Sequence, residues 1–229
     1  MMENKMQEFP DYKIVCNAGS GEYEEKKSRF IATVRPVESV EEADAFIAEM
    51  KKKYWDARHN CFAFVIGDHQ ELTRCSDDGE PAQTAGRPML DVLLREELHN
   101  TAVVVTRYFG GTLLGTGGLV RAYQKSVQEG LANSSIIDKK PGRKLTIETD
   151  YNGLGKIQYI LAQQKIPVMQ TEYTEAVKIC VVVSKEMETK LAEEITEKTG
   201  GSAALIWGDA VDFAVIGQEI RIFGENKEN

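Results

Sequence analysis

The chain has 229 residues, a formal net charge of −8, 42% hydrophobic residues and 28% charged residues. This length suits one large domain or two ordinary ones, and the composition excludes a collagen-like repeat, a globally disordered chain and a disulfide-stapled miniprotein. The acidic net charge excludes attraction of the whole molecule to nucleic acid or anionic lipid. The apolar runs at 102–105 and 179–183 are far shorter than the roughly 18 residues of a membrane helix, and the amino terminus has no apolar signal core. We therefore expect a cytoplasmic protein.

The first part of the chain predicts a mixed arrangement of strands and helices. Apolar and alternating segments predict strands at 12–16, 29–34, 61–66, 71–75 and 102–106, and periodic segments predict helices at 40–54, 89–98 and 119–133. Ser39 and Glu42 have the spacing of a capping box at the start of the first helix. The order of these elements favours an α+β layer over a doubly wound parallel sheet.

The second part of the chain predicts a ferredoxin-like domain. The pattern predicts a strand at 144–151, a helix at 154–164, strands at 168–173 and 177–183, a helix at 185–199 and a strand at 203–216. The order β-α-β-β-α-β is that of an antiparallel sheet covered by two helices on one face. Residues 138–142 predict a charged turn with Pro-Gly, so we place the domains at 1–138 and 143–223.

The strongest local signal is a glycine-rich segment, residues 109–118, between a predicted strand and a predicted helix. Such a connection brings backbone N–H groups together with the positive end of a helix dipole, an arrangement that suits an anion. The segment lacks the Gly-Lys-Ser/Thr of a phosphate-binding loop and the last glycine of a dinucleotide fingerprint. A tight turn that only allows close helix packing is the alternative. The predicted anion or nucleic-acid site comprises Arg107, Gly110, Gly111, Gly115, Gly117, Gly118, Arg121 and Lys125.

The second signal is an acidic turn, residues 76–81, which holds Asp77, Asp78 and Glu80. Three carboxylates bent by a Gly and a Pro are suited to a hard cation such as Mg²⁺. They are equally suited to the start of the following helix, where acidic groups interact favourably with the helix dipole and Thr84 is a candidate N-cap. The sequence leaves a magnesium site and a structural turn as alternatives.

Histidine and cysteine residues provide weaker signals. His59, just before a predicted strand, is a candidate catalytic acid or base, and we expect His69 and His99 to lie on the surface. A zinc site at His59, Cys61 and Cys75 is disfavoured because the spacing matches no zinc knuckle and a fourth ligand is not apparent. The four cysteines have no C-x-x-C spacing, and we expect buried thiols.

Positive charge is concentrated in one part of this acidic chain. Residues 100–145 contain seven basic side chains and two acidic ones, and we expect an anionic partner to bind there. Three aromatic residues lie close by, at Tyr108, Phe109 and Tyr123. Aromatic rings of this kind stack on bases in single-strand binders, although burial in the core is the alternative.

Several motifs together resemble the YigZ/IMPACT family. They are Ser28-Arg-Phe-Ile-Ala32, His59 with Cys61-Phe-Ala63, Ser76-Asp-Asp-Gly-Glu-Pro81 with Thr84-Ala-Gly86, and Val105-Thr-Arg-Tyr-Phe-Gly-Gly-Thr-Leu-Leu-Gly-Thr-Gly-Gly-Leu-Val-Arg-Ala-Tyr123. The resemblance covers nearly the whole chain. Family members often have Ser-Gly before Thr-Ala-Gly, whereas this chain has Ala82-Gln83, a departure that leaves the acidic turn intact.

The resemblance implies a first domain with the fold of elongation factor G domain IV, ribonuclease PH and the GHMP kinases, followed by a ferredoxin-like domain. Eukaryotic relatives regulate translation during amino-acid starvation by competing for the activator of an initiation-factor kinase. This chain lacks their extra amino-terminal domain, so only an association with translation or nucleic acid carries over.

Two functions from different classes follow. The first is a non-enzymatic binding protein that contacts RNA, the ribosome or a translation factor through Arg107, Arg121, Lys125 and the glycine-rich segment, with no cofactor. The second is a magnesium-dependent enzyme for phosphoryl transfer or hydrolysis on a nucleotide or phosphorylated small molecule. In the enzyme, the acidic turn would hold Mg²⁺ and His59 would transfer a proton, which requires the acidic turn and the glycine-rich segment to face one cleft.

Overall fold

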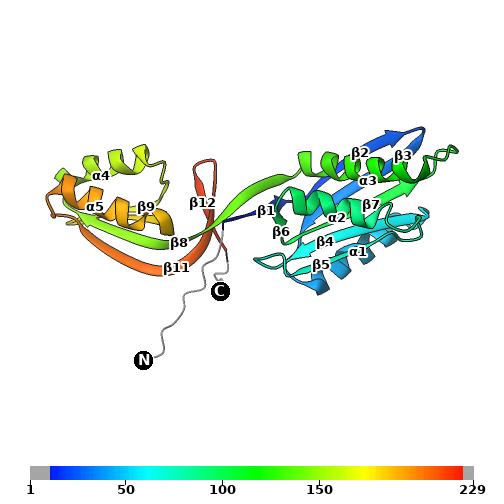
Figure 1. The fold of residues 1–229 in the computed structure, drawn as a ribbon. Helices are drawn as coiled ribbons and strands as arrows, with labels where there is room; N and C mark the ends of the chain where they lie inside the picture. Colours follow the sequence, from blue (N-terminus) through cyan, green and yellow to red (C-terminus); the bar gives the residue numbers. More distant parts are fainter. Residues whose placement is uncertain (1–10, 224–229) are drawn as a thin grey trace, which may run out of the picture. The chain divides into compact units, whose positions relative to one another are not determined.

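The computed structural model describes residues 11–223. The contacts of the chain divide them into two units, one formed by residues 12–137 and one by residues 138–223 together with Asp11. Both units combine helices with β-sheet, as Figure 1 shows. The α+β class predicted from the sequence is therefore confirmed. Within the described residues, no helix is long and apolar enough to cross a membrane.

The unit of residues 12–137 is built on a five-stranded antiparallel sheet. Its strand order is β2 (Gly19–Glu25), β3 (Ser28–Pro36), β7 (Thr101–Tyr108), β4 (His59–Ile66) and β5 (Leu72–Ser76). Helices α2 (Gly86–Arg95) and α3 (Gly115–Ala132) pack on one face, and α1 (Val40–Lys53) packs on the other (Figure 1). Strand β1 (Tyr12–Asn17) pairs in parallel with the short β6 (Leu98–His99).

Strand β2 is absent from the sequence-based prediction because its residues are mostly glycine and glutamate. The strand exists because α3 lies directly against it. A Cβ atom on Gly21 would come within 2.4 Å of the backbone of Glu129, and one on Gly19 would meet the backbone of Asn133 at 2.6 Å. Only glycine permits this approach, so two residues that weaken strand propensity are required by the helix packing.

The start of α1 agrees with the sequence prediction, whereas the start of α3 differs from it. At the start of α1, the hydroxyl of Ser39 accepts a hydrogen bond from the backbone N–H of Glu42, as the capping box predicts. The carboxylate of Glu42 reaches one residue further than expected and accepts from the N–H of Glu38. Helix α3 begins at Gly115, four residues before its predicted start, so three of the glycines assigned to a loop lie in its first turn.

The carboxy-terminal unit has the predicted β-α-β-β-α-β order. Its elements are β8 (Ser135–Thr149), α4 (Tyr151–Gln163), β9 (Val168–Tyr173), β10 (Val177–Ser184), a 3₁₀ turn η1 (Lys185–Met187), α5 (Glu188–Thr199) and β11 (Ala204–Ile216). Strand β8 lies between β10 and β11, β9 pairs with β10, and all of these pairs are antiparallel. An additional strand, β12 (Glu219–Phe223), forms a hairpin with β11. The order of the four main strands is that of a ferredoxin-like sheet.

The predicted turn at 138–142 is wrong, because these residues lie inside β8. Pro141 and Gly142 pair with Asp212 and Val211 of β11, and Gly142 also pairs with Ser184 of β10. A Cβ atom on Gly142 would be 2.6 Å from the ring of Phe213, so the glycine is needed for a ring that covers the strand. Tertiary packing therefore overrides a Pro-Gly pair that is typical of a turn.

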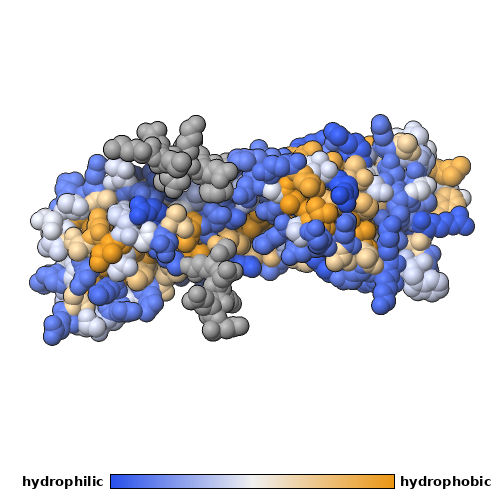
Figure 2. All heavy atoms as spheres, turned by 90° about the horizontal axis from the view of Figure 1, so that it is seen from below, coloured by the Kyte–Doolittle hydropathy of each residue, from blue (hydrophilic) through white to orange (hydrophobic). Residues whose placement is uncertain are grey.

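The two units have separate hydrophobic cores. In the first unit, the residues between the sheet and helices α2 and α3 include Phe30, Val105 and Tyr123, all fully buried. In the second, Ile147, Ile157 and Val181 are among the buried residues between the sheet and its helices. On the face drawn in Figure 2, hydrophobic side chains form separate groups between hydrophilic ones.

Candidate nucleic-acid interface

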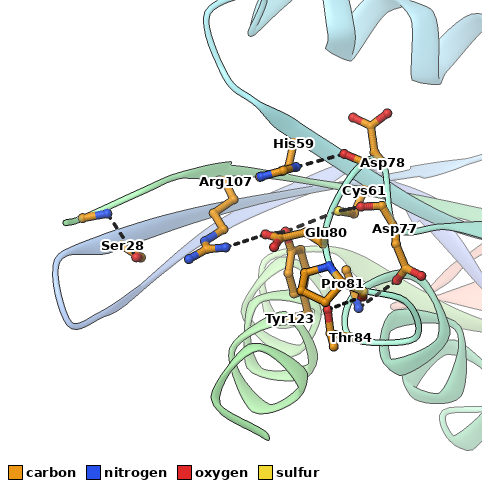
Figure 3. A network of polar contacts seen from close by, with 12 residues as sticks. Ser28, His59, Cys61, Asp77, Asp78, Glu80, Pro81, Thr84, Arg107 and Tyr123 are labelled. Carbon is orange, nitrogen blue, oxygen red and sulfur yellow. Dashed lines mark hydrogen bonds and ion pairs between the residues drawn. The ribbon is translucent and has the colours of Figure 1, made fainter. Parts of the chain in front are cut away.

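Arg107 and Glu80, which the sequence assigns to two different ligands, bind each other. The guanidinium of Arg107 lies 2.6 Å from the carboxylate of Glu80, and the two side chains are only 7% and 3% exposed (Figure 3). The hydroxyl of Tyr123 donates a 2.8 Å hydrogen bond to the same carboxylate oxygen. Arg107 follows the inward alternation of Val103 and Val105 along β7, which turns it toward the core rather than toward solvent.

The surroundings of this ion pair are largely apolar. The thiol of Cys61 lies 3.3 Å from the hydroxyl of Tyr123 and 3.0 Å from the backbone carbonyl of Asp77. Burial raises the pKa of Cys61 and the pKa of Tyr123 far above their ordinary values. Both groups therefore stay protonated at neutral pH, so the thiol is a poor nucleophile.

Asp77 serves as the cap of helix α2. Its carboxylate accepts hydrogen bonds from the backbone N–H groups of Gln83, Ala85 and Gly86, at 2.8, 3.0 and 2.8 Å. The predicted N-cap, Thr84, instead donates its hydroxyl proton to the carbonyl of Pro81. The structural alternative for the acidic turn thus holds for Asp77, whose carboxylate caps α2 although it lies nine positions before Gly86, the first residue of the helix.

Asp78 holds the acidic turn against the end of β4. Its carboxylate accepts from the backbone N–H of Asn60 at 2.7 Å and from Lys51 at 2.7 Å. Its backbone carbonyl lies 2.9 Å from Nδ1 of His59 (Figure 3). Asp77, Asp78 and Glu80 are thus directed to different partners, and the part of the chain that the structure describes holds no group of three or more acidic, histidine or cysteine side chains arranged for a metal ion.

The other histidines differ in position. His69 is exposed, as predicted. His99 is buried, contrary to its predicted surface location. It lies on β6, its ring centre is 4.6 Å from that of Tyr12 with the two planes tilted by 31°, and its Nδ1 atom is 3.0 Å from the carbonyl of Gly67. Among the hydrogen bonds of residues 11–223, none joins His69 or His99 to the glycine-rich segment.

The glycine-rich segment divides into a turn and the first turn of α3. Gly111 and Gly115 have φ values of +88° and +70°, a conformation that favours glycine, whereas Gly117 and Gly118 are helical. Leu114 occupies the N-cap position, and its apolar side chain makes no capping hydrogen bond. The first backbone N–H groups of α3 therefore lack a helical partner at an exposed helix end that carries partial positive charge.

Gly110 joins the glycine-rich segment to the hairpin between β2 and β3. Its N–H donates to the hydroxyl of Ser28 at 3.1 Å, and a Cβ atom at this position would lie 2.0 Å from the backbone of Lys27. Lys26 and Lys27 form the two-residue turn of this hairpin, with φ values of 48° and 65°. The close contact places the hairpin turn beside the glycine-rich segment.

The hairpin and helix α3 border a cavity of about 340 Å³, which we call the basic groove. Its charged lining residues are Lys26, Arg121, Lys125 and Glu25, and its other lining residues include Tyr23 and Leu114. Lys125 pairs with Glu129 at 2.9 Å, an exposed ion pair between neighbouring turns of the helix. Within residues 11–223, the side chains of Lys26 and Arg121 make no hydrogen bond or ion pair. The groove thus presents three cations and one carboxylate, that of Glu25, which accepts a 2.9 Å hydrogen bond from the hydroxyl of Tyr23.

The structure separates the basic residues that are close in sequence. Arg121 and Lys125 lie in the basic groove, whereas Arg107 is buried against Glu80. The basic residues after 138 belong to the carboxy-terminal unit, where Lys139 pairs with Asp212 and Lys140 with Asp11. The local excess of positive charge in residues 100–145 is therefore divided between the two units, and one of its members, Arg107, is buried.

The three aromatic residues also differ. Tyr123 is fully buried and Tyr108 donates its hydroxyl proton to Asp56, but Phe109 is 52% exposed. The guanidinium carbon of Arg107 lies 5.7 Å from the centre of the Phe109 ring. Of these three residues, Phe109 is the most exposed, Tyr108 is half-buried and Tyr123 is buried.

Comparison with known proteins places these features in a family. The model of the Impact N-terminal domain matches residues 26–131, and that of a domain of unknown function (DUF1949) matches residues 147–202. The chain is 41% identical to the IMPACT family member YvyE of Bacillus subtilis, over 86% of this chain and 91% of that protein. The chain belongs to the IMPACT family.

Other members of the IMPACT family match over different lengths. YigZ of Escherichia coli is 36% identical over 79% of this chain and 90% of its own length. The mouse protein IMPACT is 38% identical over 40% of this chain and 30% of its own length. A solved structure titled as a hypothetical protein is 34% identical and covers 86% of this chain and 96% of its own, with a TM-score of 0.55.

Sequence reasoning missed Tyr23 and Lys26, which lie outside the motifs that identify the IMPACT family. The available signal was Glu25-Lys-Lys-Ser28, a charged pair between two short segments. Two-residue hairpin turns favour Asn-Gly, so a Lys-Lys pair does not predict one. The hairpin contributes to the basic groove because β2 pairs with β3, a pairing that the sequence pattern does not predict.

Proposed function

We propose that this IMPACT family protein is a non-enzymatic RNA-binding protein, associated with translation, whose basic groove holds RNA phosphates. The observation that carries the proposal is the convergence of Lys26, Arg121 and Lys125 beside the uncapped start of α3, in a protein with a net charge of −8. An acidic protein that gathers cations at one groove repels nucleic acid elsewhere, which favours binding at that place.

The chemistry of the groove supports a phosphate ligand. Arg121 reaches back toward the start of its helix, since a Cβ atom on Gly117 would lie 3.5 Å from the Arg121 guanidinium. A phosphate at this end of α3 would meet backbone N–H groups, the positive pole of the helix and a guanidinium together. Tyr23 and Lys26 would contact the same ligand from the hairpin side.

The contacts of the acidic turn favour binding over the magnesium-dependent enzyme. Each of its carboxylates already has partners within the protein: backbone N–H groups for Asp77, Lys51 and a backbone N–H for Asp78, and Arg107 with Tyr123 for Glu80. Using Glu80 as a cation ligand would break the buried ion pair. Such a break leaves a charge without a partner in the domain interior.

The experiment measures fluorescence polarisation of a labelled 12-nucleotide single-stranded RNA at 50 and 150 mM salt. An Arg121→Gln/Lys125→Gln variant is compared with the wild type. The control is Arg87→Gln/Arg95→Gln, which removes the same charge from helix α2. We expect the groove variant to bind more weakly and to reduce the slope of log affinity against log salt by about 1.4, since each lost phosphate contact on a single strand removes about 0.7.

An equal loss of RNA affinity in the two double variants would contradict the proposed site, because the affinity would then depend only on the net charge of the protein. Absence of saturable RNA binding by the wild type at both salt concentrations would reject RNA and direct the search to a protein partner.

A further inference from the structure

The ring of Phe109 is half exposed and contacts the buried guanidinium of Arg107. Phe109 is the first residue after β7, and about half of its surface is in contact with solvent. The guanidinium of Arg107 lies over its ring at 5.7 Å and over the ring of Phe30 at 5.4 Å, so the cation is held between a buried ring and an exposed one. Exposed apolar residues are common, but this exposed ring also contacts a buried cation, an interaction that contributes about 0.5–1 kcal/mol at exposed sites.

The acidic turn holds the Arg107 guanidinium in place. Glu80 anchors Arg107 at 2.6 Å, and Tyr123 binds the same carboxylate oxygen, so the guanidinium is confined inside the domain (Figure 3). Preorganisation of this kind lowers the conformational entropy that a side chain loses when it contacts a ligand. The buried network thus fixes the cation that the Phe109 ring contacts, and this contact favours the observed position of the ring.

The residues after Phe109 leave space around the ring and connect it to the basic groove. Gly111 has no atom within 4 Å of the position where a Cβ would be, and it is exposed. Gly110 lies against the backbone of Lys27, the neighbour of Lys26 in the groove. An exposed ring and a phosphate-binding groove therefore flank the same hairpin turn.

We propose that Phe109 stacks on an unpaired base while the basic groove holds the adjoining phosphates, so that the protein selects single-stranded over double-stranded RNA. This inference rests on the proposed RNA-binding function. In a duplex the bases are already stacked and paired, so their faces are not accessible to an aromatic side chain. Stacking is sequence-tolerant, because every base has a π-face, and we expect weak sequence preference.

The test compares one labelled 12-nucleotide RNA as a single strand and after annealing to its complement. We expect Phe109→Ala and Phe109→Leu to lower affinity for the single strand about 5- to 100-fold, since both remove the ring, and Phe109→Trp to retain it. None of the three should change duplex binding by more than about twofold, because stacking is then unavailable. Leu113→Ala is the control, since Leu113 is 83% exposed in the same segment and carries no ring.

Phe109→Trp also offers a direct readout, because stacking on a base quenches indole emission. Quenching by the single strand beyond that of the wild type, which contains Trp55 and Trp207, is the expected result. Wild-type affinity in Phe109→Ala together with loss in Arg121→Gln/Lys125→Gln would overturn the stacking inference and leave the groove in place. Wild-type affinity in both variants would overturn both proposals.

Discussion

Arg107 and Glu80 form an ion pair in which the joined atoms are 2.6 Å apart and the side chains are 7% and 3% exposed. The pair connects strand β7 to the acidic turn, two segments that are 27 residues apart in sequence. Because Asp77 of the same turn caps α2, one short segment fixes a helix start and the base of the glycine-rich segment together.

Removal of one partner of this pair should strongly destabilise the protein. We expect Glu80→Ala and Arg107→Ala each to lower the free energy of unfolding by about 3–5 kcal/mol, because the remaining charge stays buried alone. Arg87→Gln, which breaks the exposed pair with Asp91, should cost only about 0.5 kcal/mol. Urea denaturation followed by circular dichroism measures these values. Equal costs for the buried and the exposed pair would contradict the burial argument.

Gly110→Ala should disturb the contact between the glycine-rich segment and the hairpin turn. The added methyl group would overlap the backbone of Lys27, and we expect a loss of about 1–3 kcal/mol in the free energy of unfolding. Gly117→Ala is the matched control, since its methyl group would make only an ordinary contact with Arg121. If the two substitutions have the same effect on the urea midpoint, the close approach at Gly110 is not significant for stability.

Asp77→Ala should cost more stability than a typical loss of a helix cap. The carboxylate accepts three backbone hydrogen bonds, whereas Ser39 of α1 accepts one. We expect Ser39→Ala to cost about 1 kcal/mol and Asp77→Ala to cost at least about 2 kcal/mol. Denaturation of both variants under the same conditions provides the comparison, and a smaller cost for Asp77→Ala would argue against its capping role.

Stability should fall in alkaline solution through Tyr123 and Cys61. Burial raises the pKa of both groups above their ordinary values of 10.0 and 9.0, so above about pH 9 the unfolded chain loses protons that the folded protein retains. The unfolded state then binds fewer protons, and the free energy of unfolding decreases by up to about 1.4 kcal/mol per pH unit for each group. Below pH 9 this contribution is constant.

The free energies of unfolding of Tyr123→Phe and the wild type, compared at pH 8 and pH 10.5, test whether Tyr123 causes part of the alkaline loss of stability. The variant should be less stable at pH 8, because Glu80 loses a hydrogen bond, yet should lose less stability between the two pH values. An unchanged alkaline decrease would assign the effect to other groups.

Signals confined to one element predicted the fold well. The capping residue Ser39 lies three residues from the N–H that it binds, and the period of the apolar residues identified each main element of the carboxy-terminal unit. Period-two alternation along β7 also contained the information that Arg107 points inward with Val103 and Val105. Its partner, Glu80, was not predictable, because no local pattern relates a strand to a distant turn.

Predictions failed where distant segments decide the local structure. Strand β2 depends on the approach of α3 to Gly21, and the extended conformation of Gly142 depends on the ring of Phe213. The groove residue Lys26 was missed for the same reason, since its position follows from the hairpin that β2 makes possible. A basic sequence stretch identified two of the groove cations, Arg121 and Lys125, because both lie on one helix.

The Lys26-Lys27 turn lowers the stability of the fold but places a positive charge in the basic groove. Side chains in the left-handed conformation cost roughly 1–2 kcal/mol each, and Asn-Gly would form the same turn at lower cost. Selection for thermal stability alone would therefore favour Lys26→Asn and Lys27→Gly, and would remove a cation from the groove. A stabilised version of this protein obtained by such a screen should be examined for loss of RNA binding, because its improvement would originate at the proposed binding groove.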